Sequence, residues 1–329
     1  MDDEAFLKAK LPEYQKIISS IKKEIGKIVV GQEEIIDTIL TGLMANGHIL
    51  LKGVPGIAKT VLIRTLAAAS GGQFNRIQFT VDLLPTDITG LTAYNEQKGF
   101  YVIKGPVFAN FVLADEINRA PPKVQSAMLE AMAEKQVTIG KETFPMLNPF
   151  FVLATENPIE TSGTYPLPEA QVDRFLFQVN MTYPKFDEEI EVIKRNIQIK
   201  SFDDYGLKAV TTPEKIVEMQ ETVKKVYLGP EVEKYIVQIV DSTRHPKKYG
   251  IEFGKYIEWG ASPRASIYLF IASKSLAMMK GDTFVTPSHV KEVAYNVLRH
   301  RIILNYEGLG ENIKTDDIIS EILSKVPVP

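Results

Sequence analysis

The sequence contains no cysteine, and that absence excludes several classes of protein. Without thiols the 329-residue chain cannot form disulfides, use a thiolate nucleophile or bind zinc through cysteine. A chain that needs no disulfides suits a reducing compartment, so we expect a cytoplasmic protein.

Long hydrophobic runs are also missing. No apolar stretch approaches the ~18 residues that a membrane-spanning helix needs. The N-terminus, MDDEAFLKAK, is acidic and lacks the apolar core of a signal peptide. The net charge of −3 provides no basic field that would attract nucleic acid or an acidic membrane. We therefore expect neither a membrane span nor a nucleic-acid partner.

The chain does contain an alternation of strand and helix patterns over its first half. Five short, almost continuously apolar runs predict strands buried on both faces of a parallel sheet: HILLKG, NRIQFT, NFVLADE, PFFVLATEN and FLFQVNM. Helical patterns lie between several of them. After about residue 183 the strand patterns disappear and amphipathic helical patterns dominate. The sequence thus predicts an α/β domain over residues 1–183 and an all-helical domain over 184–329.

Two segments are longer than a simple strand–helix unit requires. Residues 83–109 are interrupted by proline and glycine, and residues 137–147 alternate around Gly140-Lys141, a pattern typical of a β-hairpin. Long insertions in a compact domain are often functional.

The stretch GVPGIAKT (53–60) fits the phosphate-binding P-loop pattern G-x-x-x-x-G-K-[ST] except at Ala58, which stands where glycine is usual. A strand leads into it and a helix leads out, which is the context that a P-loop requires. Gly53 and Gly56 let backbone amides converge on phosphate oxygens. Lys59 would contact the β- and γ-phosphates and the Thr60 hydroxyl would bind Mg²⁺. A chance glycine turn is the alternative interpretation.

Adjacent carboxylates follow the third predicted strand. Neighbouring side chains at a strand end project differently, so Asp115 and Glu116 can divide two tasks. Asp115 can hold Mg²⁺, and Glu116 can act as the general base that activates water. A charged strand end without function is common in isolation, but the P-loop upstream makes the pair more specific.

Three further polar residues complete an ordered series. Asn157 ends the fourth strand, where its amide could orient a water or sense the γ-phosphate. Arg174 directly precedes the fifth strand and Arg264 lies near a helix start. A guanidinium group is planar and always charged, so either arginine could stabilise charge on a leaving phosphate. Alone, each arginine would more often be a surface ion-pair partner.

This series resembles the AAA+ ATPases, with GVPGIAKT as Walker A, FVLADE as Walker B, Asn157 as sensor 1, Arg174 as arginine finger and Arg264 as sensor 2. Within AAA+ it is most similar to the MoxR family, through VVGQEE, ADEINRAPPKVQSAMLEAMAE, ATENPIE, YPLPEAQVDRF and GASPRA, and the alanine in GVPGIAKT is also familiar there. The resemblance implies an αβα sandwich with a five-stranded parallel sheet and a C-terminal helical lid. Segment 83–109 would be a helix-2 insert and 137–147 a pre-sensor-1 hairpin.

The resemblance also implies a Mg²⁺-dependent ATPase that forms a homo-oligomeric ring, commonly a hexamer, with ATP bound between subunits. The VVGQ segment would lie beside the adenine, and Arg174 would reach the neighbouring subunit. The expected nucleotide contacts are Val30, Gly31, Gln32, Gly53, Val54, Pro55, Gly56, Ile57, Ala58, Lys59, Thr60, Val61, Asp115 and Arg264. MoxR-like proteins resemble chaperones that remodel or mature partners, often von Willebrand factor A domain proteins with bound metal.

Two other functions compete with the chaperone interpretation. MCM helicases share both inserts, which makes a DNA-dependent motor the main alternative. DNA-translocating inserts should carry several basic residues. Here Lys98 and Lys104 are balanced by Asp87 and Glu96, and Lys141 is followed by an acidic residue, which favours a protein client. A non-hydrolysing scaffold is disfavoured because every catalytic position is filled.

Overall fold

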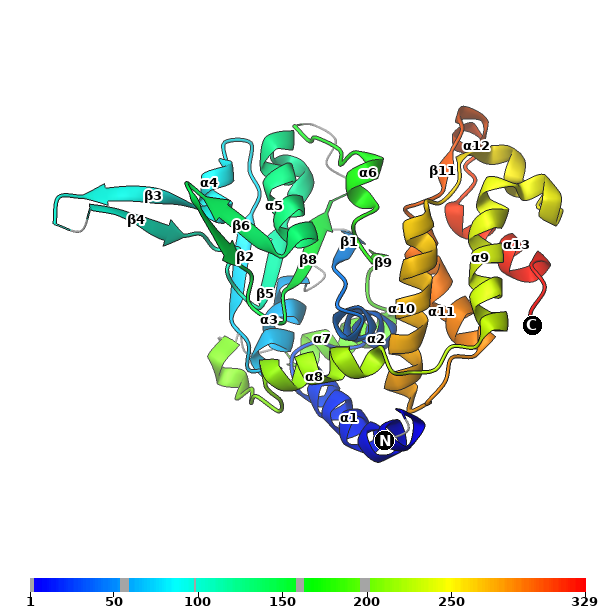
Figure 1. Cartoon of the computed structure of the whole chain (residues 1–329), viewed down its shortest axis with the longest axis horizontal. Coiled ribbons are helices and arrows are strands. Elements are labelled where there is room, and N and C mark those ends of the chain that lie inside the picture. The colour runs from blue at the N-terminus through cyan, green and yellow to red at the C-terminus, as the bar shows by residue number, and fades with distance from the viewer. Residues whose placement is uncertain (1–2, 54–58, 98, 158–162, 196–201) are drawn as a thin grey trace.

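The computed structural model describes residues 3–53, 59–97, 99–157, 163–195 and 202–329 (Figure 1). Its centre is a five-stranded parallel sheet in the order β2-β5-β8-β1-β9. The strands are β1 (Ile49–Gly53), β2 (Phe74–Gln78), β5 (Phe111–Asp115), β8 (Phe151–Glu156) and β9 (Phe177–Met181). They coincide with the five apolar runs, so the predicted five-stranded parallel sheet is confirmed.

Side-chain alternation along the strands produces two hydrophobic layers. In β1, Ile49 and Leu51 enter the core on one face of the sheet, and Leu50 enters the core on the other. The first layer includes α1 (Asp3–Ile25), α2 (Glu33–Met44) and α3 (Lys59–Ala69). The second includes α4 (Pro85–Thr89), the short helix η1 (Ile117–Arg119) and α5 (Pro122–Glu134). The result is the expected αβα sandwich, and all five strands end at one edge.

The two inserts form hairpins beside each other. β3 (Gly90–Asn95) and β4 (Gly99–Lys104) make an arm that projects from the body, and β6 (Gln136–Ile139) with β7 (Glu142–Pro145) makes the second hairpin (Figure 1). The second was predicted; the β3–β4 arm was not. At its base two glycines are required, because a Cβ on Gly90 would lie 2.6 Å from the Gly105 nitrogen. Lys98 lies outside the described residues.

The C-terminal part is mostly helical. It contains α7 (Phe186–Arg195), α8 (Pro213–Val223), α9 (Pro230–Arg244), α10 (Pro263–Lys280), α11 (Pro287–Leu298), α12 (Tyr306–Gly310) and α13 (Thr315–Lys325). The helical lid predicted for this part is confirmed, with one addition: a short two-stranded antiparallel sheet, β10 (Ile257–Trp259) with β11 (Ile303–Leu304), which the sequence did not predict. These strands are two and three residues long, too short to produce a recognisable alternation.

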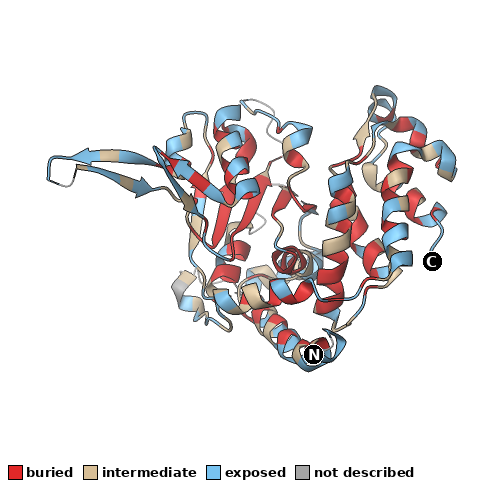
Figure 2. Ribbon diagram, viewed as in Figure 1, coloured by how far each residue is buried: buried red, intermediate tan, exposed pale blue. Residues whose placement is uncertain are grey.

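The first helices after residue 183 pack on the αβα domain. On α8, the Gln220 side chain donates to the Leu43 carbonyl over 2.7 Å, and Thr222 lies 3.1 Å from the Tyr14 hydroxyl. Helices α9 to α13 form the outer part of the lid, with buried residues on their inner faces (Figure 2). None of the described helices is long and apolar enough to cross a membrane.

Candidate functional site

The two carboxylates predicted from the sequence lie at the end of β5 and are linked by a threonine. Asp115 is the last residue of the strand, and Glu116 follows it with a left-handed backbone (φ 57°). The Glu116 N–H donates to the Thr155 hydroxyl over 2.8 Å, and that hydroxyl donates to Asp115 Oδ1 over 2.7 Å. A left-handed glutamate is uncommon, so the Thr155 bridge from β8 fixes a turn that the backbone alone disfavours.

Side chains from the neighbouring edge strand β2 hold the same carboxylates. Arg76 forms an ion pair of 2.6 Å with Asp115 Oδ2, and Gln78 Nε2 donates to Glu116 Oε2 over 2.9 Å. Arg119, from the turn after Glu116, lies 3.0 Å from the same glutamate oxygen. Both carboxylates are therefore held in a fixed hydrogen-bond network, and each keeps part of its side chain exposed.

Lys59, the seventh residue of GVPGIAKT, begins α3. Its ammonium donates to the Gly53 carbonyl at the end of β1 over 2.5 Å, across the intervening loop. Burial lowers the pKa of Lys59, and the negative charges of Asp115 and Glu116 oppose that shift. The lysine thus lies within the electrostatic reach of both carboxylates. Thr60 and Val61 follow it in the first turn of α3. Val54, Pro55, Gly56, Ile57 and Ala58 lie outside the described residues.

Asn157 directly follows β8, the strand between β1 and β5. It is buried, with 5% of its surface exposed. The residue before it, Glu156, forms an ion pair of 3.1 Å with Lys52 of β1. The carboxyl ends of adjacent parallel strands therefore bring Lys59, Asn157 and the Asp115–Glu116 pair to one edge of the sheet.

The first three residues of the VVGQ segment line a cavity of about 330 Å³ between α1 and α2. Its lining includes Val29, Val30 and Gly31, together with Lys22 and Ile36. Gly31 has a φ of 65°, a left-handed conformation that favours glycine, and a Cβ there would lie 2.3 Å from the Glu188 carboxylate of α7. Gln32 also has a left-handed backbone (φ 58°) as it leads into α2.

The two predicted arginines share one neighbour. Arg264, in the first turn of α10, pairs with Asp173 over 3.0 Å, and Asp173 directly precedes Arg174. The Arg174 guanidinium donates to the Leu129 carbonyl of α5 over 3.0 Å. Among the described residues, the hydrogen bonds of Arg264 lead to Ser262 and Asp173. The structure thus places Arg264 beside Arg174, on the flank of the domain formed by α6 (Glu169–Val172) and α10.

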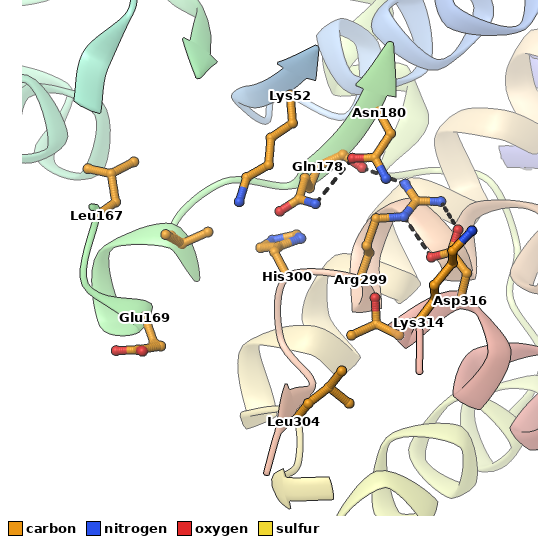
Figure 3. A pocket seen from close by; sticks show the side chains of 12 residues that line it. Lys52, Leu167, Glu169, Gln178, Asn180, Arg299, His300, Leu304, Lys314 and Asp316 are labelled. Atoms are coloured by element: carbon orange, nitrogen blue, oxygen red, sulfur yellow. Dashed lines mark hydrogen bonds and ion pairs between the residues drawn. The ribbon is translucent and has the colours of Figure 1, made fainter. Parts of the chain in front are cut away.

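A second cavity, of about 460 Å³, lies where the lid meets β9 (Figure 3). Lys52, Gln178 and Asn180 reach it from the sheet, and Arg299 and His300 reach it from the end of α11. Arg299 pairs with Asp316 over 2.7 Å and donates to the Gln178 carbonyl over 2.9 Å. Its side chain thus covers part of the outer edge of β9, beside which the described residues form no further strand.

Sequence reasoning missed the residues that hold the predicted ones in place, chiefly Thr155, Arg76, Gln78 and Asp173. A signal existed for two of them. Arg76 and Gln78 are polar residues at alternate positions of β2, which places both on the same face of the sheet. Thr155 and Asp173 gave no such signal, because their partners are distant in sequence.

Comparison with known proteins gives a consistent result. Residues 48–177 match the sequence model of the ATPase family associated with various cellular activities (AAA), and residues 254–322 match that of the AAA lid domain. The chain is 46% identical over 308 residues to the chaperone MoxR1 of Mycobacterium tuberculosis, covering 93% of this chain and 81% of that one.

Two further relatives cover nearly the whole length. Protein MoxR of Paracoccus denitrificans is 30% identical over 325 residues, or 93% of this chain and 94% of that protein. A crystal structure of a candidate ATPase from Cytophaga hutchinsonii superposes with a TM-score of 0.92 at 49% identity, covering 98% of this chain and 97% of the other.

Proposed function

Because the chain belongs to the MoxR family of AAA+ ATPases, we propose that it is an ATP-hydrolysing chaperone that remodels or matures partner proteins. The observation that carries the proposal is the Asp115–Thr155–Glu116 bridge, which holds two carboxylates at the end of β5 within electrostatic reach of Lys59. A charged strand end without a catalytic role would not require a left-handed glutamate fixed from a neighbouring strand.

Each residue at this edge then has a separate task. Glu116 accepts a proton from the attacking water, for which its partly exposed carboxylate is suited. Lys59 exchanges the Gly53 carbonyl for phosphate oxygens, and its low exposure strengthens that interaction. Asn157 orients water between them. Residues 53–61 surround the phosphates. Val30 and Gly31 line the cavity proposed for adenine, and Gln32 follows them in the chain.

The oxygen donors present fit Mg²⁺, which prefers carboxylate and hydroxyl ligands. Asp115 at the end of β5 and Thr60 in the first turn of α3 are the residues that would hold it. When bound, Mg²⁺ would neutralise negative charge on the phosphate oxygens.

The two arginines support a site shared between subunits in a homo-oligomeric ring, for which we propose a hexamer. Arg174 lies on the α6 flank, and we propose that it contacts the γ-phosphate bound by the neighbouring subunit. Because Arg264 pairs with the residue before Arg174, we assign Arg264 to the same flank. The domains that move relative to each other are 1–183 and 184–329.

For the client we propose a protein in the cytoplasm, with von Willebrand factor A domain proteins and metal-cofactor insertion as the specific case. The β3–β4 arm and the β6–β7 hairpin enclose a groove of about 850 Å³ with aromatic residues in its lining. Phe100 and Tyr94 on the arm are largely exposed, which suits an apolar protein surface better than phosphate.

The Glu116→Gln variant tests this function. We expect it to bind ATP with unchanged affinity and to lose turnover by about 10²- to 10⁴-fold, because the general base is gone. Affinity capture with this variant in the presence of ATP should then retain the client. Near-normal hydrolysis would remove Glu116 from the mechanism.

A DNA-dependent motor is the alternative. Tight DNA binding that weakens steeply with salt would support it and would contradict the chaperone proposal. Neither insert is strongly basic: residues 83–109 carry Lys98 and Lys104 against Asp87 and Glu96. On the β6–β7 hairpin Lys141 is followed by Glu142, and both line the groove.

A further inference from the structure

Asp173, the residue directly before Arg174, is held by two arginines of the lid. Arg301, just after α11, donates from Nε to Asp173 Oδ1 over 2.7 Å. Arg264 and Ser262, at the start of α10, donate to Asp173 Oδ2 over 3.0 and 2.9 Å. The aspartate therefore uses both of its oxygens to join residues 173–175, here called the finger segment, to α10 and to the chain just after α11.

Arg301 is the buried member of this cluster of charged residues. Its side chain is only 1% exposed, whereas that of Arg264 is 45% exposed. Its guanidinium also donates to the carbonyls of Asp173 and Phe175, over 2.9 and 2.6 Å. Burial lowers the pKa of Arg301 to about 10, and the Asp173 charge opposes that shift. A buried guanidinium of this kind needs its carboxylate partner.

A tyrosine of α10, the helix that also carries Arg264, completes the attachment of the finger segment to the lid. The Tyr268 hydroxyl donates to the Arg174 carbonyl over 3.0 Å, and its ring lies 4.8 Å from the Arg301 guanidinium carbon. The main chain is thus held by the lid at Asp173, Arg174 and Phe175. The Arg174 guanidinium takes no part in this attachment and contacts the Leu129 carbonyl instead.

The other end of α10 lies on α2, the helix that follows the proposed adenine segment. Ser275 donates to the Thr41 carbonyl over 2.7 Å, and the Thr41 hydroxyl lies 3.3 Å from the Met279 sulfur. With 18 residues, α10 is about 27 Å long. One continuous helix therefore contacts the finger segment at its start and the nucleotide-binding half of the same chain near its end.

We propose that Asp173 is a positioning residue that locks the arginine finger to the lid, so that the lid, itself attached to α2 of the same chain, holds Arg174 in position for the neighbour's ATP. This inference rests on the proposed role of Arg174 in a shared site. Asp173 contacts neither nucleotide; it acts through Arg174.

A carboxylate is required because two guanidinium groups must be satisfied at once. In Asp173→Asn one oxygen is replaced by an NH₂ group, which cannot accept a hydrogen bond and would face a cation. One of the two lid contacts must then be lost, and the finger segment is released on that side.

Subunit mixing distinguishes this role from general damage. We expect Asp173→Asn to bind a fluorescent ATP analogue within about 3-fold of wild type and to lose at least about 10-fold in kcat, because small displacements of a catalytic group reduce rates steeply. Mixing it with Lys59→Ala should recover activity, since Lys59→Ala subunits supply an intact finger to the sites of Asp173→Asn subunits. Mixing it with Arg174→Ala should recover nothing.

Asp241→Asn is the matched control. Asp241 is also a lid aspartate with three side-chain partners, Lys248, His245 and Tyr249, and its loss should leave activity unchanged. If Asp173→Asn does not give folded protein, Tyr268→Phe takes the same test, because it removes only the hydroxyl that binds the Arg174 carbonyl.

Two results would overturn the inference. If Arg174→Ala and Lys59→Ala complement each other but Asp173→Asn and Lys59→Ala do not, Asp173 does not act through the finger, although the shared site stands. If even Arg174→Ala and Lys59→Ala fail to complement, the shared site itself is wrong and the inference falls with it.

Discussion

Thr155 is the residue that links the two halves of the carboxylate pair. Its hydroxyl accepts from the Glu116 N–H and donates to Asp115, and it is almost fully buried. The hydroxyl proton is donated to Asp115, and a lone pair of the same oxygen accepts the Glu116 N–H. A single group therefore sets the geometry of both carboxylates.

Thr155→Val tests that dependence. The change keeps the side-chain shape but leaves the Glu116 N–H without its acceptor, at a cost of about 1–3 kcal/mol in the free energy of unfolding. We expect turnover to fall by about 10- to 100-fold while ATP binding is retained. Urea denaturation and steady-state kinetics measure the two effects. Thr155→Ser, which keeps the hydroxyl, should restore most of the activity; equal loss in both variants would show that the hydroxyl is not responsible.

His48 gives the fold a dependence on pH. Its Nδ1 accepts from the Val152 N–H and its Nε2 lies 3.2 Å from the Met132 carbonyl, so the buried ring is neutral. Burial lowers the pKa of His48 from 6.5 to about 4. Because the unfolded chain binds the proton more tightly, the stability contribution is complete above pH 6.5 and is lost as pH falls towards 4.

The expected loss from His48 is about 2 kcal/mol between about pH 7 and about pH 5, at roughly 1.4 kcal/mol per pH unit below the unfolded pKa. Urea denaturation at the two pH values measures it. His48→Gln keeps a donor and an acceptor but does not titrate. The free energy of unfolding of the variant should therefore fall by about 2 kcal/mol less than that of wild type between the two pH values. The buried ring of His300 titrates in the same direction and remains in both proteins. An identical pH dependence in wild type and variant would contradict the assignment.

At the scale of elements, the β3–β4 arm is unusual because it exposes large apolar side chains on both faces. Cross-strand pairing places Tyr94 beside Phe100 on one face and Leu91 beside Ile103 on the other. All four are more than 40% exposed. Because these side chains are exposed on both faces, the arm adds little to the stability of the domain. We assign it the role of contacting the client.

Substitution of the arm should therefore separate stability from function. We expect Phe100→Ser to change the free energy of unfolding by less than about 0.5 kcal/mol, as is usual for surface positions. Phe177→Ala, in the sheet core, should cost about 3–5 kcal/mol by comparison. Basal hydrolysis by Phe100→Ser should be normal, while client capture by Phe100→Ser combined with Glu116→Gln should be lost. Full capture would exclude the arm as the docking element.

Much of the fold followed from periodicity, and the reason is local. The five strands are short apolar runs bounded by polar residues, and the β6–β7 hairpin contains a glycine turn at its centre. The β3–β4 arm was missed because GLTAYN and GFYVIK are apolar on both faces and so do not alternate. The β10–β11 pair was missed because each strand has only a few residues.

In the candidate site too, residues defined by local sequence patterns were predicted, and contacts between distant segments were not. Residues in motifs, such as Lys59, Asp115 and Glu116, were predictable because spacing along the chain defines them. Their supporting contacts depend on strand order, which brings Thr155 of β8 and Arg76 of β2 to either side of β5. The position of Arg264 beside Asp173 likewise depends on where the lid folds back, and no local pattern encodes that.

At the scale of the whole molecule, the lid is attached to both sides of the αβα domain. Helix α8 packs on α1 and α2, while α10 extends from α2 to the segment before Arg174. We retain the division at residues 183 and 184 as a proposal, with α8 lying on the first domain. This double attachment supports the proposal that the lid transmits nucleotide-dependent motion to a neighbouring subunit.

The most direct test of the shared catalytic site is hydrolysis by mixtures of Lys59→Ala and Arg174→Ala. Each variant alone should be inactive, since one lacks the phosphate-binding lysine and the other an arginine worth about 10³- to 10⁵-fold in rate. Some interfaces in a mixed ring pair an intact P-loop with an intact Arg174, so activity should appear on mixing and peak near equal proportions. Hydrolysis that stays at background at every ratio, with both variants folded and binding to each other, would contradict the account.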